Sequence, residues 1–220
     1  MIQLVNLTKY FVLSNKKKHF IFKDLNFTFP DNCSIGLMGR NGTGKSTLLR
    51  ILGGLDIPNK GKVIVDKSIS WPVGFAGGFQ GSLSARDNIK FIARVYGYSG
   101  EALKEKVEYV KEFAELGDYF DEPIRSYSSG MKSRISFGLS MAFDFDYYLI
   151  DEAGAVGDKT FKEKSRKIYE EKLSKSKVIM VSHDINEIKT WCDKIVFLEN
   201  GTATIYDDVD EGINKYKESC

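Results

Sequence analysis

The sequence predicts an α/β domain with an inserted helical subdomain and an N-terminal antiparallel β subdomain. Three observations lead to this fold class. Short apolar runs alternate with segments of helical periodicity. One apolar run leads directly into a glycine-rich loop that is followed by a helical segment. Residues 84–143 change character and carry amphipathic helical patterns with charged outer faces, which indicates a helical block placed inside the α/β domain.

The N-terminal part of the chain is expected to be β-structure. Residues 2–13 and 20–29 alternate between apolar and polar side chains, as half-buried strands do. The polar and basic segment SNKKKH, residues 14–19, is expected to form the loop between them. A turn at 30–32 precedes the apolar run CSIGLMG, residues 33–39, which is typical of a strand buried in a sheet.

The remaining elements follow the chain as alternating strands and helices. Helices are expected at 45–54, 86–97, 100–116, 159–175, 186–193 and 209–219, and one that opens at Ser128–Gly130. Strands are expected at 61–66, 147–151, 177–183, 194–200 and 201–207. We therefore expect a single domain over 1–220, with the core and β subdomain in 1–83 and 144–220 and the helical subdomain in 84–143.

Composition excludes several classes of protein. The formal net charge is only +2, which gives no strong indication of nucleic-acid binding. The three cysteines, Cys33, Cys192 and Cys220, are widely spaced and form no C-x-x-C, which argues against a disulfide framework or a zinc site. The N-terminus lacks the pattern of a signal peptide, and the apolar runs are too short to cross a bilayer.

The stretch GRNGTGKST, residues 39–47, predicts a phosphate-binding loop. It matches G-x-x-x-x-G-K-S between a strand and a helix, which is the context that gives this pattern its meaning. Glycines allow backbone N–H groups to surround phosphate oxygens, and the N-terminus of the helix adds positive potential. The alternative is a glycine turn without a ligand, which the Lys-Ser-Thr in register disfavours. The expected phosphate-binding residues are Gly39, Asn41, Gly42, Thr43, Gly44, Lys45, Ser46 and Thr47, with Ser46 also on Mg²⁺.

Two further strand ends are expected beside this loop. The run YYLIDE ends in Asp151, a candidate Mg²⁺ ligand, and Glu152, a candidate general base that polarises the attacking water. Taken alone, this pair is equally well explained as surface acids after a strand. The run VSHD places His183 at the same sheet edge, where it can hydrogen-bond a phosphate, although a lone histidine is more often structural.

Together these residues resemble the ATP-binding cassette family. The P-loop GRNGTGKST, a helical insertion, a signature at YSSGM, YYLIDE, AVGD and VSHD occur in the order that the family shows. The resemblance covers nearly the whole chain and implies a P-loop NTPase fold that binds ATP and Mg²⁺. It also implies that Glu152 is the catalytic base, that His183 senses the γ-phosphate, and that Asp158 is the D-loop aspartate bridging two subunits.

The resemblance also assigns residues outside the phosphate loop. Ser128 and Gly130 of the signature are expected to contact the γ-phosphate, with Ser129 beside them. An aromatic after NLTK is expected to stack on adenine, and Phe11 and Tyr10 are the two candidates; a strand-edge aromatic is the alternative for both. Gln80 is the candidate Q-loop glutamine and metal ligand, although it lies about four residues closer to the following helix than the family pattern has it.

Two departures from the family pattern narrow the resemblance. The usual Leu-Ser-Gly-Gly-Gln signature is replaced by Tyr127-Ser128-Ser129-Gly130-Met131. With GFAGGFQGSLSARDNI and DEAGAVGD, this signature resembles the ATPases of bacterial polysaccharide exporters, and among them the capsular polysaccharide branch. Related O-antigen exporters often carry an extra C-terminal carbohydrate-binding domain, which is not expected in a chain of this length.

This resemblance implies a set of partners and a location. A homodimer, an integral membrane permease and a lipid-linked polysaccharide as indirect substrate are implied, at the cytoplasmic face of the bacterial inner membrane. The alternatives are another exporter's ATPase, a soluble cassette ATPase acting on nucleic acid or ribosomes, and a non-catalytic regulatory subunit. The loop SNKKKHF, residues 14–20, is interpreted as a solvated hairpin tip, with a contact to the membrane or to an anionic glycan as the alternative.

Overall fold

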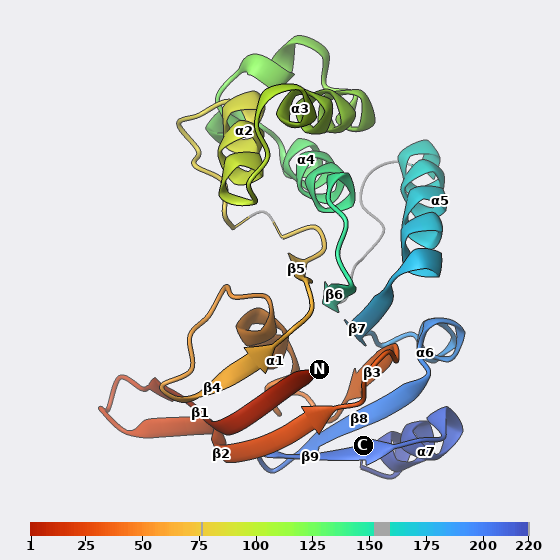
Figure 1. Cartoon of the computed structure of the whole chain (residues 1–220). Helices are drawn as coiled ribbons and strands as arrows, with labels where there is room; N and C mark the ends of the chain where they lie inside the picture. The colour runs from red at the N-terminus through yellow and green to blue at the C-terminus, as the bar shows by residue number, and fades with distance from the viewer. Residues whose placement is uncertain (76, 152–158, 220) are drawn as a thin grey trace. The chain divides into compact units, whose positions relative to one another are not determined.

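The computed structural model describes residues 1–75, 77–151 and 159–219, and it divides into two compact units (Figure 1). The first unit contains residues 1–72, the strand segment that begins at Phe145, and the C-terminal part from Leu173 onward. The second contains Val73–Asp144 and the following helix as far as Lys172. The helical subdomain expected at 84–143 lies within this second unit, while the division of the chain into domains stays a prediction.

An antiparallel sheet of three strands, in the order β2-β1-β4, forms one part of the first unit. Its strands are β1 (Ile2–Val12), β2 (Lys18–Phe29) and β4 (Lys60–Val65). Leu4 of β1 pairs with Phe27 on one side and Val63 on the other. The register shifts several times between Leu4 and Tyr10 in the β1–β2 pair, so the hairpin continues past irregular positions to its turn.

A second sheet in this unit has six strands in the order β5-β6-β7-β3-β8-β9. They are β3 (Ile35–Met38), β5 (Ile69–Pro72), β6 (Tyr147–Asp151), β7 (Lys177–Val181), β8 (Lys194–Glu199) and β9 (Thr202–Tyr206). All neighbouring pairs are parallel except β8 and β9. Because β6, β7 and β3 are adjacent and parallel, the loops after their carboxyl ends meet at one sheet edge.

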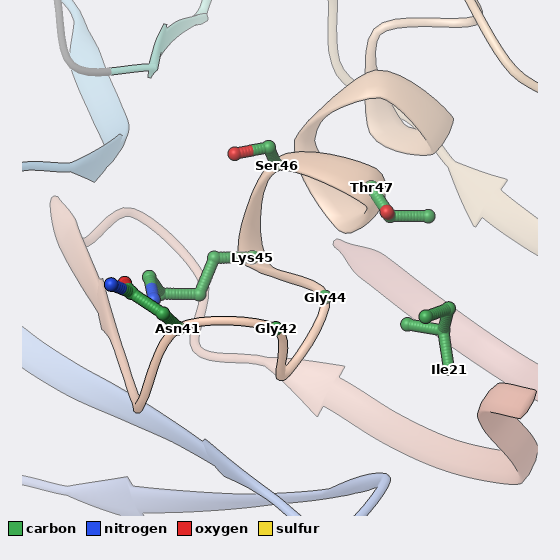
Figure 2. Close-up of a pocket in the computed structure, with 7 residues that line it drawn as sticks. All are labelled: Ile21, Asn41, Gly42, Gly44, Lys45, Ser46 and Thr47. Atoms are coloured by element: carbon green, nitrogen blue, oxygen red, sulfur yellow. The ribbon is translucent and has the colours of Figure 1, made fainter.

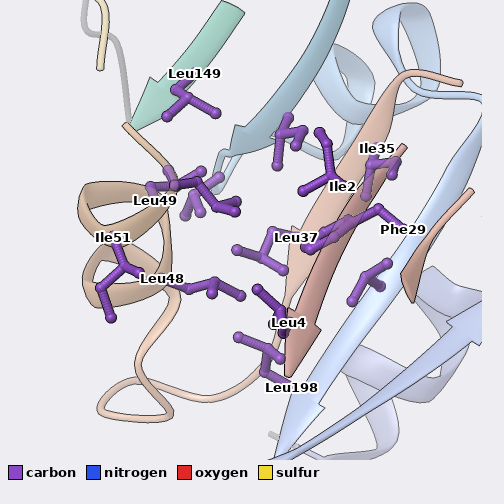
Figure 3. Packing of buried hydrophobic residues seen from close by; sticks show 14 of the residues in the cluster. Ile2, Leu4, Phe29, Ile35, Leu37, Leu48, Leu49, Ile51, Leu149 and Leu198 are labelled. Carbon is purple, nitrogen blue, oxygen red and sulfur yellow. The ribbon is translucent and has the colours of Figure 1, made fainter. Parts of the chain in front are cut away.

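Helix α1 (Lys45–Leu52) supplies a large share of the first unit's core. Leu48 and Leu49 are fully buried, and Figure 3 shows them beside Leu4 of β1, Leu37 of β3 and Leu198 of β8. Burying a leucine side chain contributes about 1.5–3 kcal/mol, so this packing holds the start of α1 in place. Two further helices of this unit, α6 (Ile185–Trp191) and α7 (Val209–Ser219), follow β7 and β9.

The second unit is helical. It contains α2 (Ala85–Val95), α3 (Gly100–Ala114), 3₁₀ turns at Gly117–Asp121 and Ile124–Ser126, α4 (Ser129–Ala142) and most of α5 (Lys159–Lys175). Helices α3 and α4 pack closely at Gly138, where an added Cβ would lie 2.6 Å from the Phe113 ring. The ammonium group of Lys106 also donates a 2.6 Å hydrogen bond to the Ala142 carbonyl, which ties α3 to the end of α4.

Most elements lie where the sequence predicts them, and the strand β5 is the main addition. Its Ser70 hydroxyl accepts a 2.9 Å hydrogen bond from the Leu149 backbone N–H of β6. Among the described residues, no helix combines the length and the apolar character needed to span a bilayer.

Candidate functional site

The loop between β3 and α1 depends on glycines at two crowded positions. Gly39 and Gly44 have φ angles of 147° and 97°. A Cβ at Gly39 would lie 2.3 Å from the Leu198 carbonyl oxygen, and one at Gly44 would lie 2.3 Å from Cγ2 of Ile21. Both the backbone conformation and the available space therefore require glycine, and the predicted loop conformation has a physical cause.

The side chain of Lys45 folds back over this loop. Its Nζ atom donates hydrogen bonds to the carbonyl oxygens of Gly39, at 2.7 Å, and Arg40, at 3.1 Å. The Thr43 hydroxyl donates to the same Arg40 carbonyl at 2.9 Å. The loop thus positions an ammonium group over its own backbone, where it lies ready for a phosphate oxygen (Figure 2).

A pocket of about 230 Å³ opens at this loop (Figure 2). It is lined by Ile21, Asn41, Gly42, Gly44, Lys45, Ser46 and Thr47. The first turn of α1 carries no acidic side chain, so the positive potential of the helix N-terminus is preserved. A glycine-rich loop, an ammonium group and a helix N-terminus that line one pocket are suited to binding a phosphate group.

Ile21 is the lining residue that the sequence did not predict. It lies on β2, in the antiparallel sheet, and packs against Gly44. Apolar alternation identifies residues 20–29 as a strand, but it carries no information on which distant loop crosses a given strand position.

A hydrogen bond joins the end of β6 to the first turn of α1, next to the phosphate loop. The Ser46 hydroxyl donates to Oδ1 of Asp151 at 3.0 Å, and Asp151 pairs with Val181 of the neighbouring β7. A hydroxyl and a carboxylate at this distance are the hard oxygen ligands that Mg²⁺ takes, usually together with waters and phosphate oxygens. The residues present therefore fit a magnesium ion held between Ser46 and Asp151.

His183 is exposed in the short loop between β7 and α6, and a hydrogen-bonded turn surrounds it. Before it, the Ser182 hydroxyl donates to Glu187 at 2.5 Å and accepts from the Asp184 backbone N–H at 3.1 Å. After it, the Asp184 carboxylate caps α6 by accepting from the Asn186 backbone N–H at 2.8 Å. The contact between Ser182 and Glu187 was not predicted from the sequence, because it depends on the turn that brings α6 back over the strand end.

The two candidate adenine-stacking residues differ in their surroundings. Phe11 is 46% exposed, and Lys9 Nζ lies 5.2 Å from its ring centroid. The Tyr10 ring instead packs against Phe20, with centroids 5.3 Å apart, and lies under Lys18 Nζ at 4.3 Å. Tyr10 is therefore engaged within the hairpin, whereas Phe11 presents an exposed ring, which favours Phe11 as the stacking residue.

The remaining predicted residues lie in the helical unit or outside the described residues. Ser128 is the N-cap of α4, and its hydroxyl accepts from the Met131 N–H at 3.2 Å. Ser129 begins the helix, and a Cβ at Gly130 would lie 3.9 Å from Ser128 Oγ, an ordinary contact distance. Gln80 precedes α2, and its amide donates to the Ser82 hydroxyl at 3.2 Å. The candidate base Glu152 and the D-loop candidate Asp158 lie outside the described residues.

Comparison with known proteins gives closely related chains and a solved cassette. The chain is 55% identical over 99% of its length to the polysialic acid transport ATP-binding protein KpsT of Escherichia coli, covering 96% of that protein. It is 42% identical over its whole length to the ATP-binding protein BexA of Haemophilus influenzae, covering 99% of that protein. A dimeric structure of MJ0796, a bacterial ABC transporter cassette, superposes with a TM-score of 0.66 at 25% identity, covering 94% of this chain and 98% of the cassette.

The family model described as ABC transporter matches residues 22–155, which include the phosphate loop, the helical unit up to α4 and the strand end at Asp151. This range and the relatives above agree with the motif order in the sequence and confirm the predicted fold class. The chain belongs to the ABC transporter family.

Proposed function

We propose that this chain is the ATP-hydrolysing subunit of a bacterial exporter of capsular or related cell-surface polysaccharide. Two relatives that match along nearly their full length support this function, since one is named for polysialic acid transport and another as an ATP-binding protein. A relative from Neisseria meningitidis, 40% identical, is named as a capsule polysaccharide export ATP-binding protein. In this proposal a separate membrane-spanning permease carries the lipid-linked glycan, and the chain acts at the cytoplasmic face of the inner membrane.

The observation that carries the ATPase proposal is that Lys45 folds over the phosphate loop while the next residue, Ser46, is hydrogen-bonded to Asp151. Lys45 would bind the β- and γ-phosphates, and the loop N–H groups would bind the remaining phosphate oxygens. Ser46 and Asp151 would hold Mg²⁺, which neutralises phosphate charge when bound. Phe11 would stack on the adenine ring.

Hydrolysis and coupling would involve residues around this centre. Glu152 directly follows Asp151 and would polarise the attacking water, while His183 would hydrogen-bond the γ-phosphate. The signature residues Ser128, Ser129 and Gly130 would contact the nucleotide of a second copy, and Asp158 would bridge the two copies. Gln80 would complete the metal site in this scheme.

The dimer part of the proposal is supported by the MJ0796 cassette, whose solved structure is dimeric. The N-terminus of α4 has the chemistry needed for the contact, because first-turn N–H groups of a helix have no acceptor within the helix. Gly130 has no side chain beside them, so a phosphate group could approach the backbone closely. A two-fold dimer would then form two equivalent nucleotide sites.

The decisive experiment separates hydrolysis from export. The Glu152→Gln enzyme should bind ATP with near-normal affinity and hydrolyse it at least about a hundredfold more slowly, as loss of a general base requires. Near-normal hydrolysis would remove Glu152 from its role. In cells whose own capsule-export ATPase is deleted, the wild-type chain should restore surface polysaccharide and the variant should not. If the wild-type chain has full ATPase activity but restores no surface polysaccharide, the export part of the proposal is contradicted and the ATPase part stands.

A further inference from the structure

The tip of the β1–β2 hairpin is a defined turn whose residues are exposed. All residues from 11 to 20 are exposed, and the turn joins the two red strands at their far end from the N-terminus (Figure 1). The Leu13 N–H donates to the Lys17 carbonyl at 2.9 Å, and the Lys16 N–H donates back to the Leu13 carbonyl at 2.8 Å. Asn15 closes the turn by accepting from the Lys17 N–H at 3.0 Å.

Strand pairing gives this hairpin two different faces. Opposite residues of an antiparallel pair project to the same side, and neighbours along a strand alternate. Tyr10 is opposite Phe20, and Val12 is opposite Lys18. These four side chains share one face, as the ring contact of Tyr10 with Phe20 and the position of Lys18 over Tyr10 confirm. Phe11, opposite His19, lies on the other face.

The first of these faces combines exposed apolar groups with unneutralised positive charge. Val12 is 64% exposed and Phe20 is 44% exposed, next to the partly buried Tyr10. Lys16 and Lys17 extend the charge of Lys18 around the turn, and residues 11–23 contain no acidic side chain. Within the described part of the chain, none of these three lysines forms an ion pair. The tip surface, defined here, consists of Tyr10, Val12, Lys18 and Phe20 on this face, together with Lys16 and Lys17 of the turn at the end of the hairpin.

We propose that the tip surface docks directly on an anionic lipid bilayer. The three ammonium groups would contact lipid phosphates, since a basic side chain near an anionic membrane surface is attracted to it. Val12 and Phe20 would enter the boundary between headgroups and acyl chains, with Tyr10 at the headgroup level that aromatic rings prefer. Charge alone would also attract a soluble polyanion. A soluble polyanion, however, would offer no apolar contact to the exposed side chains of Val12 and Phe20.

The two-faced hairpin makes membrane docking compatible with nucleotide binding. Phe11, the proposed adenine-stacking residue, faces away from the tip surface. Lipid and nucleotide would therefore bind at the same time, and variants at Val12, Phe20 and the three lysines should retain ATP binding. The proposal goes beyond the export function and does not depend on the exported glycan, because it concerns the purified chain and lipid alone.

Vesicle flotation of the purified full chain tests this inference. The chain should float with vesicles of phosphatidylcholine containing about 30% phosphatidylglycerol and not with pure phosphatidylcholine, and added salt should weaken the binding. Lys16→Ser/Lys17→Ser/Lys18→Ser should weaken binding about tenfold or more. Val12→Ser/Phe20→Ser, which keeps the charge, should also weaken it several-fold. The matched control, Lys60→Ser/Lys62→Ser/Lys67→Ser, removes equal charge from exposed positions on or near β4 and should bind as the wild type does.

Several outcomes would overturn the inference. Equal flotation with both vesicle types would exclude recognition of anionic lipid. An equal loss in the control would mean that net charge, rather than the hairpin tip, drives binding. Unchanged binding of Val12→Ser/Phe20→Ser would exclude insertion of the apolar groups and leave non-specific charge attraction. ATP affinity and the thermal unfolding temperature, measured on every variant, separate a lost surface from a lost fold.

Discussion

The Ser46 hydroxyl donates a hydrogen bond of 3.0 Å to Oδ1 of Asp151, joining the first turn of α1 to the carboxyl end of β6. The two residues are 105 positions apart in the sequence, so only the parallel sheet brings them together. This bond fixes two oxygen atoms on one side of the phosphate loop. The same two atoms are the proposed protein ligands of Mg²⁺.

Ser46→Ala should separate the magnesium function from nucleotide binding. Loss of the hydroxyl removes one metal ligand while Lys45 and the loop backbone remain, so hydrolysis should fall about tenfold or more. ATP binding measured with EDTA present should be unchanged. Ser46→Thr, which restores the hydroxyl, is the matched control and should retain most activity. Equal Mg²⁺ dependence in the alanine variant and the wild type would contradict the assignment.

Gly44→Ala should disrupt the phosphate loop, because the added Cβ would lie 2.3 Å from Ile21 and 2.7 Å from the Phe22 ring. We expect ATP binding to be lost and the free energy of unfolding to fall by roughly 3 kcal/mol, measured by denaturant titration. Gly54→Ala is the control, since Gly54 also has a positive φ, of 70°, but has open space at its Cβ. It should cost only about 1 kcal/mol and leave ATP binding intact.

Phe11→Ala should weaken ATP binding about tenfold or more, since stacking a base on an aromatic ring contributes roughly 1–3 kcal/mol. Binding of inorganic tripolyphosphate, which has no base, should not change. Phe11→Trp should restore ATP affinity. Tyr10→Ala serves as the comparison and tests the second candidate, because Tyr10 packs against Phe20 within the hairpin. A larger loss of ATP affinity in Tyr10→Ala than in Phe11→Ala would reverse the assignment.

The sequence predicts the local parts of this site better than the long-range ones. The conformation of residues 39–47 is determined locally, since the glycines, the lysine and the helix start are contiguous in the sequence. The structure forms the loop and helix that these residues predict. Ile21 and the bond from Ser182 to Glu187 were missed because each depends on chain crossings that no local pattern encodes. The strand β5 was missed for a related reason. It has only four residues, too few to show a clear alternation of apolar and polar side chains. It is identified as a strand by its pairing with β6.

The pair Ser68 and Asp146 should make the stability of the β5–β6 edge depend on pH. The Asp146 carboxylate accepts hydrogen bonds from the Ser68 N–H at 2.7 Å and the Ser68 hydroxyl at 2.8 Å, and these bonds lower the pKa of Asp146. A carboxyl with a lowered pKa in the folded state stabilises the protein above its unfolded pKa, near 4, and loses this contribution as the pH falls further.

Asp146→Asn should therefore destabilise the chain at pH 7, because a charged hydrogen-bond acceptor is lost. Asp146 is exposed to solvent, which limits the loss to about 1 kcal/mol. Below about pH 4 the stability difference between variant and wild type should shrink, because the wild-type carboxyl becomes protonated as well. Denaturant titrations at several pH values measure this difference. Asp144→Asn, at an exposed acid two residues earlier that pairs with Lys172 in the helical unit, is the comparison. A difference that stays constant from pH 7 to pH 3 would show that the charge of Asp146 does not contribute, and would leave only the geometry of its hydrogen bonds.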